Sequence, residues 1–173
     1  MLPGMAREFE VSRSIDIAVP HETAYSEVSD VRQMGRWSPE NRGAVVKGEF
    51  DHAYVGMRFV GDNKRGSARW KTECVVTTAD AGKRFSFDVV KYGFGSTFVP
   101  IRIATWAYDF EAVNGGTRVI ETWTDGRTRW PDFTTRIFDP VATRKPSFAE
   151  FQKGNIQRTL ANLKRELEAD AAV

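Results

Sequence analysis

The 173-residue chain is poor in metal-binding and redox side chains, with one cysteine and two histidines. A single cysteine, Cys74, excludes an intramolecular disulfide and any cysteine-cluster metal site. His21 and His52 stand far apart in the sequence and form no HxH or HExxH motif, so we expect no metal site. The chain also lacks the GxSxG, P-loop and Rossmann glycine patterns, and we expect no cofactor.

Long apolar runs are missing as well, and neither sign of charge dominates. No run could span a bilayer, and the start MLPGMAREFE has no apolar core of signal-peptide length. We therefore expect a cytoplasmic protein with a reduced thiol and no stable membrane insertion. Met5 is an alternative start to Met1. A net charge of +2 is too small to indicate a nucleic-acid partner, and we expect a monomer or a homodimer.

Aromatic residues are abundant: twelve Phe, five Trp and four Tyr make up 12% of the chain. Side chains of this size either fill a generous core or line a cavity. The hydrophobic share of 41% and the charged share of 28% are typical of a globular protein. The length fits one domain, which we place at residues 7–170.

Alternating apolar residues, separated by turns rich in Gly, Asn and Asp, predict strands joined by short loops and hence antiparallel neighbours. Two small helices are predicted after the first strand, and Pro39 ends the second of them. The best helix, 147–169, begins with a capping box of Ser147 and Glu150 and carries an apolar stripe. The predicted strands are 8–19, 43–47, 58–63, 67–77, 84–91, 101–112 and 117–125. We predict an α+β fold in which a curved antiparallel sheet of about seven strands surrounds the C-terminal helix.

This order of elements is accompanied by distinctive local sequences. They are DVRQMGRWSPE at 30–40, RWKTECVV at 69–76, AGKRFSFDV at 81–89, WAYDFEAVNGGTRVIETW at 106–123 and NIQRTLANLKRELE at 155–168. Together they resemble the SRPBCC superfamily, also called START-like or helix-grip, and its polyketide cyclase/dehydrase-like branch. The resemblance runs from Glu8 to Ala169. It implies that an apolar small molecule or lipid binds between the sheet and the last helix, where a minority of members catalyse cyclisation or dehydration.

Strand alternation places several aromatic side chains on the predicted inner face of the sheet. Trp37, just before the helix stop at Pro39, is expected to plug one end of the sheet. The alternative for these residues is an ordinary packed core. The candidate ligand-binding residues are Trp37, Trp70, Phe85, Phe87, Trp106, Tyr108, Trp123 and Phe151.

Glu121 is the candidate catalytic residue. It alternates in step with Val119 and Trp123, so it points inward if they do. A buried carboxyl group needs a partner or a raised pKa, which makes Glu121 a candidate acid or ligand anchor. The alternative is an edge or salt-bridged glutamate. On the strand 67–77, alternation predicts that Cys74 faces inward and that Glu73 faces solvent.

Residues 126–146 form an insertion before the last helix relative to the shortest members of the superfamily. Its aromatic residues lie among arginines, a mixture compatible with a cavity lid, a membrane-touching patch or an acidic-ligand contact. The alternative is a loop packed over the last helix. Within that helix, Gly154 costs about 1 kcal/mol relative to alanine, and it predicts a close backbone approach or a bend.

The sequence supports three functional hypotheses. The first is the binding of a hydrophobic or lipid-like molecule, supported by the resemblance and by the aromatic surplus. The second is a polyketide cyclase or dehydratase that uses Glu121 as general acid or base. The third is a protein-interaction domain that uses the insertion at 126–146.

Overall fold

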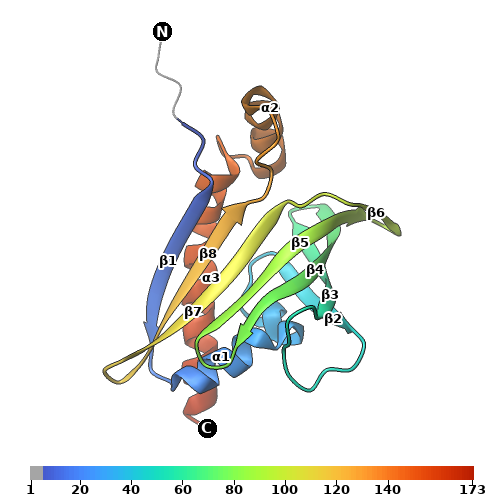
Figure 1. The fold of residues 1–173 in the computed structure, drawn as a ribbon. Coiled ribbons are helices and arrows are strands. Elements are labelled where there is room, and N and C mark those ends of the chain that lie inside the picture. The colour runs from blue at the N-terminus through green and yellow to red at the C-terminus, as the bar shows by residue number, and fades with distance from the viewer. Residues whose placement is uncertain (1–5) are drawn as a thin grey trace.

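The computed structural model describes residues 6–173, so Met1 and Met5 lie outside the described part. One antiparallel sheet curves around a long C-terminal helix (Figure 1). Its strand order is β1-β8-β7-β5-β4-β3-β2, and the short β6 pairs with β5. This arrangement confirms the predicted helix-grip architecture. No helix within residues 6–173 is long and apolar enough to cross a membrane.

The strands are β1 (Glu10–Ile17), β2 (Asn41–Lys47), β3 (Arg58–Arg65), β4 (Ala68–Asp80), β5 (Arg84–Phe94), β6 (Thr97–Val99), β7 (Ala104–Val113) and β8 (Gly116–Asp125). The helices are α1 (His21–Ser29), the 3-10 helix η1 (Val31–Arg36), α2 (Asp132–Thr143) and α3 (Phe148–Ala171). The two small helices between the first strands are therefore confirmed. Neither β6 nor α2 is predicted from the sequence.

A tight turn fixes the register of β7 and β8, the two strands that carry most of the candidate site. Gly115 adopts a φ of +84°, which favours glycine. At Gly116, a Cβ atom would lie 2.0 Å from the carbonyl oxygen of Ile17, so no larger residue fits. The turn places Tyr108 opposite Glu121 and Trp106 opposite Trp123.

The helix α3 closes the inner side of the sheet and packs closest to β1 and β8 (Figure 1). Half of its predicted capping box forms, because the Ser147 hydroxyl accepts a hydrogen bond from the Glu150 backbone N–H at 3.1 Å, whereas the Glu150 carboxylate accepts a bond from Lys153. Trp37 is buried in the core, and its carbonyl oxygen accepts a 3.0 Å bond from Asn162 of α3. The backbone of this turn is therefore joined to α3, and the Trp37 side chain belongs to the core.

Glu73 corrects one exposure prediction. Cys74 faces the core as predicted, but Glu73 is buried as well. Three basic side chains cover its carboxylate, with N–O distances of 3.0 Å to Lys47, 2.9 Å to Arg58 and 3.3 Å to Lys91. Alternation fixes the face on which a side chain lies, whereas exposure depends on neighbouring strands that the local pattern does not reveal.

Candidate functional site

Six of the nine predicted site residues are neighbours on the inner face of β5, β7 and β8. Trp106 lies opposite Phe87 on one side and opposite Trp123 on the other. Most of the six side chains are buried, and Trp106 is half-buried against the core. The six are Phe85, Phe87, Trp106, Tyr108, Glu121 and Trp123.

Glu121 is the chemically unusual member of this group. Its side chain is in the core, at 1% exposure, so the predicted inward orientation is confirmed. The Tyr108 hydroxyl donates a 2.9 Å hydrogen bond to Oε1 of Glu121. The second oxygen, Oε2, is buried and has no hydrogen-bond partner among the described residues.

Burial dominates the protonation of this pair. It raises the pKa of Glu121 to about 8, although the hydrogen bond from Tyr108 acts in the opposite direction. Burial and the neighbouring carboxylate also raise the pKa of Tyr108 well above its ordinary value. At neutral pH, Glu121 is therefore mostly a neutral acid that keeps one O–H donor.

The helix α3 contributes buried polar groups that the sequence reading missed. Asn155 donates a 3.0 Å bond to Gln152, and Thr159 donates a 3.1 Å bond to the Asn155 carbonyl oxygen. The side-chain oxygen of Asn155 is buried without a partner among residues 6–173. Lys164 binds the carbonyl oxygen of Asp16 on β1, and Asn155 lies on the opposite side of the helix. Asn155 therefore faces away from β1.

Arg65, also missed, joins two predicted residues that are distant in sequence. Its guanidinium carbon lies 4.1 Å from the ring centre of Phe151 and 5.2 Å from that of Trp70. The same guanidinium pairs with Glu40 and donates a 2.6 Å bond to the Ala142 carbonyl oxygen. Arg65 alternates in step with the buried Phe59, a pattern that could have revealed its inward orientation.

Trp37 lies apart from this group. It is bonded to Asn162, whereas Phe151 lies eleven positions earlier in α3, about 16 Å along a helix axis. Trp37 and Phe151 therefore lie at distant points along α3, and the nine predicted residues do not surround one small site. A ligand-binding role for Trp37 stays a prediction.

Two small surface hollows of about 190 and 220 Å³ lie elsewhere. They are lined by residues of 16–21 and 113–116, with Lys164 beside one of them. Both are smaller than the roughly 300–1,000 Å³ of typical ligand pockets. Neither hollow includes Glu121 or its aromatic neighbours, so both are separate from the candidate site.

An open antiparallel sheet that wraps a long C-terminal helix, with short helices after the first strand, defines the START-like class of folds. The family model described as "Polyketide cyclase / dehydrase and lipid transport" matches residues 8–168. The chain belongs to this family. Its polyketide cyclase-like membership within SRPBCC, inferred from the sequence resemblance, is thereby confirmed. A search of curated proteins found no match.

Solved structures support the fold. A Polyketide_cyc-like protein of Corynebacterium glutamicum is 25% identical, with a TM-score of 0.57 and 96% of each chain covered. A START superfamily protein of Mycobacterium smegmatis is 13% identical, with a TM-score of 0.65, covering 94% of this chain and 99% of the other. The di-domain ARO/CYC StfQ of the steffimycin biosynthetic pathway is 13% identical, with a TM-score of 0.64, covering 95% of this chain and 52% of the other.

Proposed function

We propose that the protein binds an apolar or lipid-like small molecule against the inner face of β5, β7 and β8, with Glu121 as its polar anchor. The family and the fold fit a hydrophobic ligand-binding cavity. The observation that carries the proposal is the buried Glu121 carboxyl group, one oxygen of which has no hydrogen-bond partner within residues 6–173. Buried polar atoms in a core with a purely structural role are nearly always hydrogen-bonded.

The chemistry of this anchor limits the ligand. A buried donor or acceptor without a partner costs about 1–3 kcal/mol, and a ligand atom that pairs with it recovers that cost. Because Glu121 is neutral, its free O–H can donate to a carbonyl or hydroxyl oxygen of the ligand. The aromatic side chains around it provide apolar contact area. The expected ligand is therefore mainly apolar and carries an oxygen acceptor.

Prodan, an uncharged naphthalene dye with one ketone oxygen, tests this proposal by its fluorescence. We expect saturable binding in the low-micromolar range, about −8 kcal/mol. Trp106→Ala should change the affinity several-fold, because the ring is half-buried beside Phe87 and Trp123. Lys71→Ala is the matched control, since Lys71 lies exposed on β4.

A second dye separates the anchor from the aromatic surface. N-phenyl-1-naphthylamine is similarly apolar but has no carbonyl oxygen. Glu121→Leu should weaken prodan binding and leave the binding of the second dye nearly unchanged. The absence of saturable binding of either dye, or an effect of Lys71→Ala as large as that of Trp106→Ala, would refute the proposal.

Catalysis is a second candidate function, and one specific observation favours it. A pKa of about 8 places Glu121 near the operating pH, as general acid–base catalysis requires. Tyr108 supplies the polar partner that a catalytic carboxyl group needs. If Glu121 moves a proton of a polyketide-like substrate, Glu121→Gln should abolish cyclisation or water loss while prodan affinity stays within a few-fold. Retained turnover in that variant would exclude this role.

A further inference from the structure

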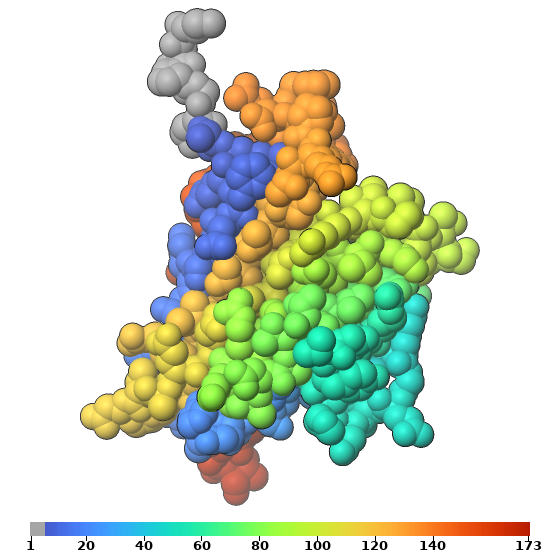
Figure 2. All heavy atoms as spheres, viewed as in Figure 1, coloured from blue at the N-terminus to red at the C-terminus, as the bar shows by residue number. Residues whose placement is uncertain are grey.

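The helix α2 has an inverted pattern of side chains. Its buried residues are polar: Thr135, Asp139 and Thr143. Its opposite side is apolar and exposed, at 68% for Phe133, 67% for Ile137 and 82% for Val141. Surface helices of globular proteins normally bury the apolar side. Figure 2 shows the segment that contains α2 standing out from one end of the molecule.

Polar contacts explain why α2 stays attached in this orientation. Arg127, which is buried, binds Asp139 at 2.7 Å and Asp125 at 2.8 Å. The second carboxylate oxygen of Asp139 accepts a 2.9 Å bond from the backbone N–H of Phe148, at the start of α3. The three buried polar side chains of α2 are thus all hydrogen-bonded. The apolar side of the helix is presented outward without any rearrangement.

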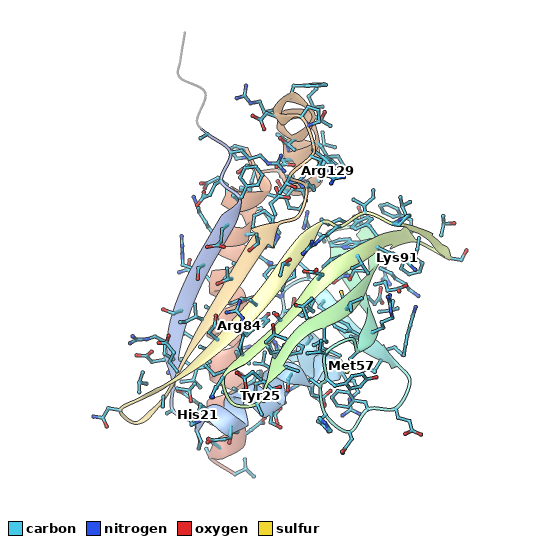
Figure 3. All side chains as sticks on the ribbon, viewed as in Figure 1. His21, Tyr25, Met57, Arg84, Lys91 and Arg129 are labelled. Atoms are coloured by element: carbon cyan, nitrogen blue, oxygen red, sulfur yellow. The ribbon has the colours of Figure 1, made fainter. Side chains whose placement is uncertain are left out.

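The charges around this apolar side have one dominant sign. Between residues 128 and 146, four basic side chains are exposed and only Asp132 provides an exposed acid. Arg129 lies in the connection from β8 to α2 (Figure 3). A helix with an apolar face flanked by basic residues is typical of segments that lie in the interface of an anionic membrane. The four basic residues are Arg129, Arg136, Arg144 and Lys145.

We propose that α2 docks reversibly on an anionic lipid surface. Phe133, Ile137 and Val141 would enter the boundary between headgroups and acyl chains, and the basic residues would contact the lipid phosphates and carboxylates. This inference goes beyond ligand binding in the core and does not depend on Glu121. Its two components are separable: apolar insertion gives affinity, and the basic residues give selectivity for anionic lipid.

A second copy of the chain fits this surface less well. A symmetric contact between two α2 helices would bring the same basic residues against one another. Stable interfaces bury about 800 Å² on each partner. The apolar side of α2 comes from one helix of 12 residues, which offers a narrow contact. Charge and size therefore favour the anionic lipid surface.

One end of α2 also lies near two of the predicted ligand-binding residues. The Ala142 carbonyl oxygen, near the end of α2, accepts the 2.6 Å bond from Arg65. Arg65 in turn lies over Phe151 and Trp70. A molecule leaving a membrane at this end of α2 would therefore lie near Phe151 and Trp70, two of the predicted ligand-binding residues.

Vesicle flotation with the full chain tests the docking. The lipids are phosphatidylcholine alone or phosphatidylcholine mixed with phosphatidylserine. We expect at least about tenfold stronger binding to the anionic vesicles, weakened by added salt. The double variant Ile137→Ser/Val141→Ser should lose about tenfold or more of that binding, because it removes the inserted side chains.

The matched control is Val45→Ser/Val55→Ser, which changes two equally exposed apolar residues outside α2. It should bind anionic vesicles within about twofold of the unchanged protein. The docking proposal fails if the two double variants behave alike, if phosphatidylcholine alone binds as well, or if no vesicle binds. It also fails if light scattering shows a dimer that only the α2 variant dissociates. Prodan binding, measured in parallel, reports separately on the core site.

Discussion

The structure contains two buried polar clusters, one under α2 and one under α3, and they differ in how completely their groups are paired. Under α2, Arg127 binds two buried carboxylates, Asp125 and Asp139, with several hydrogen bonds. Under α3, Glu121 and Asn155 each keep one buried oxygen without a partner among the described residues. A paired cluster can fix one arrangement of elements, whereas an unpaired group retains a penalty that a ligand can remove.

Hence the first cluster holds α2 in place, and the second is the better candidate for ligand chemistry. The two helices also differ on their outer sides. The outer side of α3 is polar, as in most surface helices, whereas that of α2 is apolar. On α2 the buried positions are taken by polar residues, so the apolar residues of the same helix are exposed.

The largest expected effect comes from breaking the paired cluster. Arg127→Met leaves the buried Asp139 without its cation and leaves Asp125 with Arg7 alone, and removing one partner of a buried ion pair typically costs about 3–5 kcal/mol. Urea unfolding followed by circular dichroism measures the free energy of unfolding. Arg129→Met makes the same chemical change at an exposed residue and should stay within about 0.5 kcal/mol. Equal effects of the two changes would show that the cluster does not stabilise the fold.

The next prediction concerns pH, because the two clusters change the free energy of unfolding in opposite directions as pH rises. Burial raises the pKa of Glu121 from 4.5 to about 8. As pH rises between these values, the unfolded chain loses this proton while the folded chain keeps it. Glu121 therefore lowers the free energy of unfolding by up to about 1.4 kcal/mol per pH unit. Below the lower value this penalty is absent.

For Asp125, burial raises the pKa, but hydrogen bonds from Arg127 and Arg7 outweigh it, so the net pKa is lowered. Its stabilisation is present at neutral pH and is lost as pH falls through the folded-state pKa.

The free energy of unfolding, measured from pH 5 to 9 on the original protein and on Glu121→Gln, isolates the contribution of Glu121. The difference in free energy of unfolding between the two proteins should change with pH up to about pH 8 and then become constant. If the two proteins show the same dependence of the free energy of unfolding on pH, Glu121 is not a neutral buried acid in the folded protein.

Sequence patterns predicted the sheet and α3 because these elements bury apolar residues at regular spacing. Alternation also placed Glu121 inward, since its neighbours in step, Val119 and Trp123, belong to the core. The same reasoning missed α2, whose inner residues are polar and whose apolar residues face outward. Phe133, Ile137 and Val141 recur every four residues, a helical signal present in the sequence. Pro140 obscured it.

The candidate site was predictable only in part. Its aromatic residues follow strand parity, but Asn155 shares α3 with an apolar stripe and contributes no apolar signal. Arg65 acquires its role from Glu40, Ala142 and Phe151, which lie on other segments of the chain. Such contacts depend on how distant segments pack, and no local pattern specifies them. The pairing of Tyr108 with Glu121 depends on the register of β7 and β8.

The smallest expected effect compares one glycine beside each cluster. The sequence predicted a close backbone approach or a bend at Gly154, but among the described residues only the end of the Arg158 side chain lies near a Cβ built there, at 3.4 Å, which argues against the close approach. Gly154→Ala should therefore stabilise the protein by up to about 1 kcal/mol through helix propensity. Gly126→Ala should destabilise it, because its Cβ would lie 3.0 Å from the backbone of Arg102 and Ile103. Thermal unfolding of both variants gives the signs. A destabilising Gly154→Ala would restore the idea of a tight contact on α3 beside Asn155, and would show that this end of the candidate site is already closely packed.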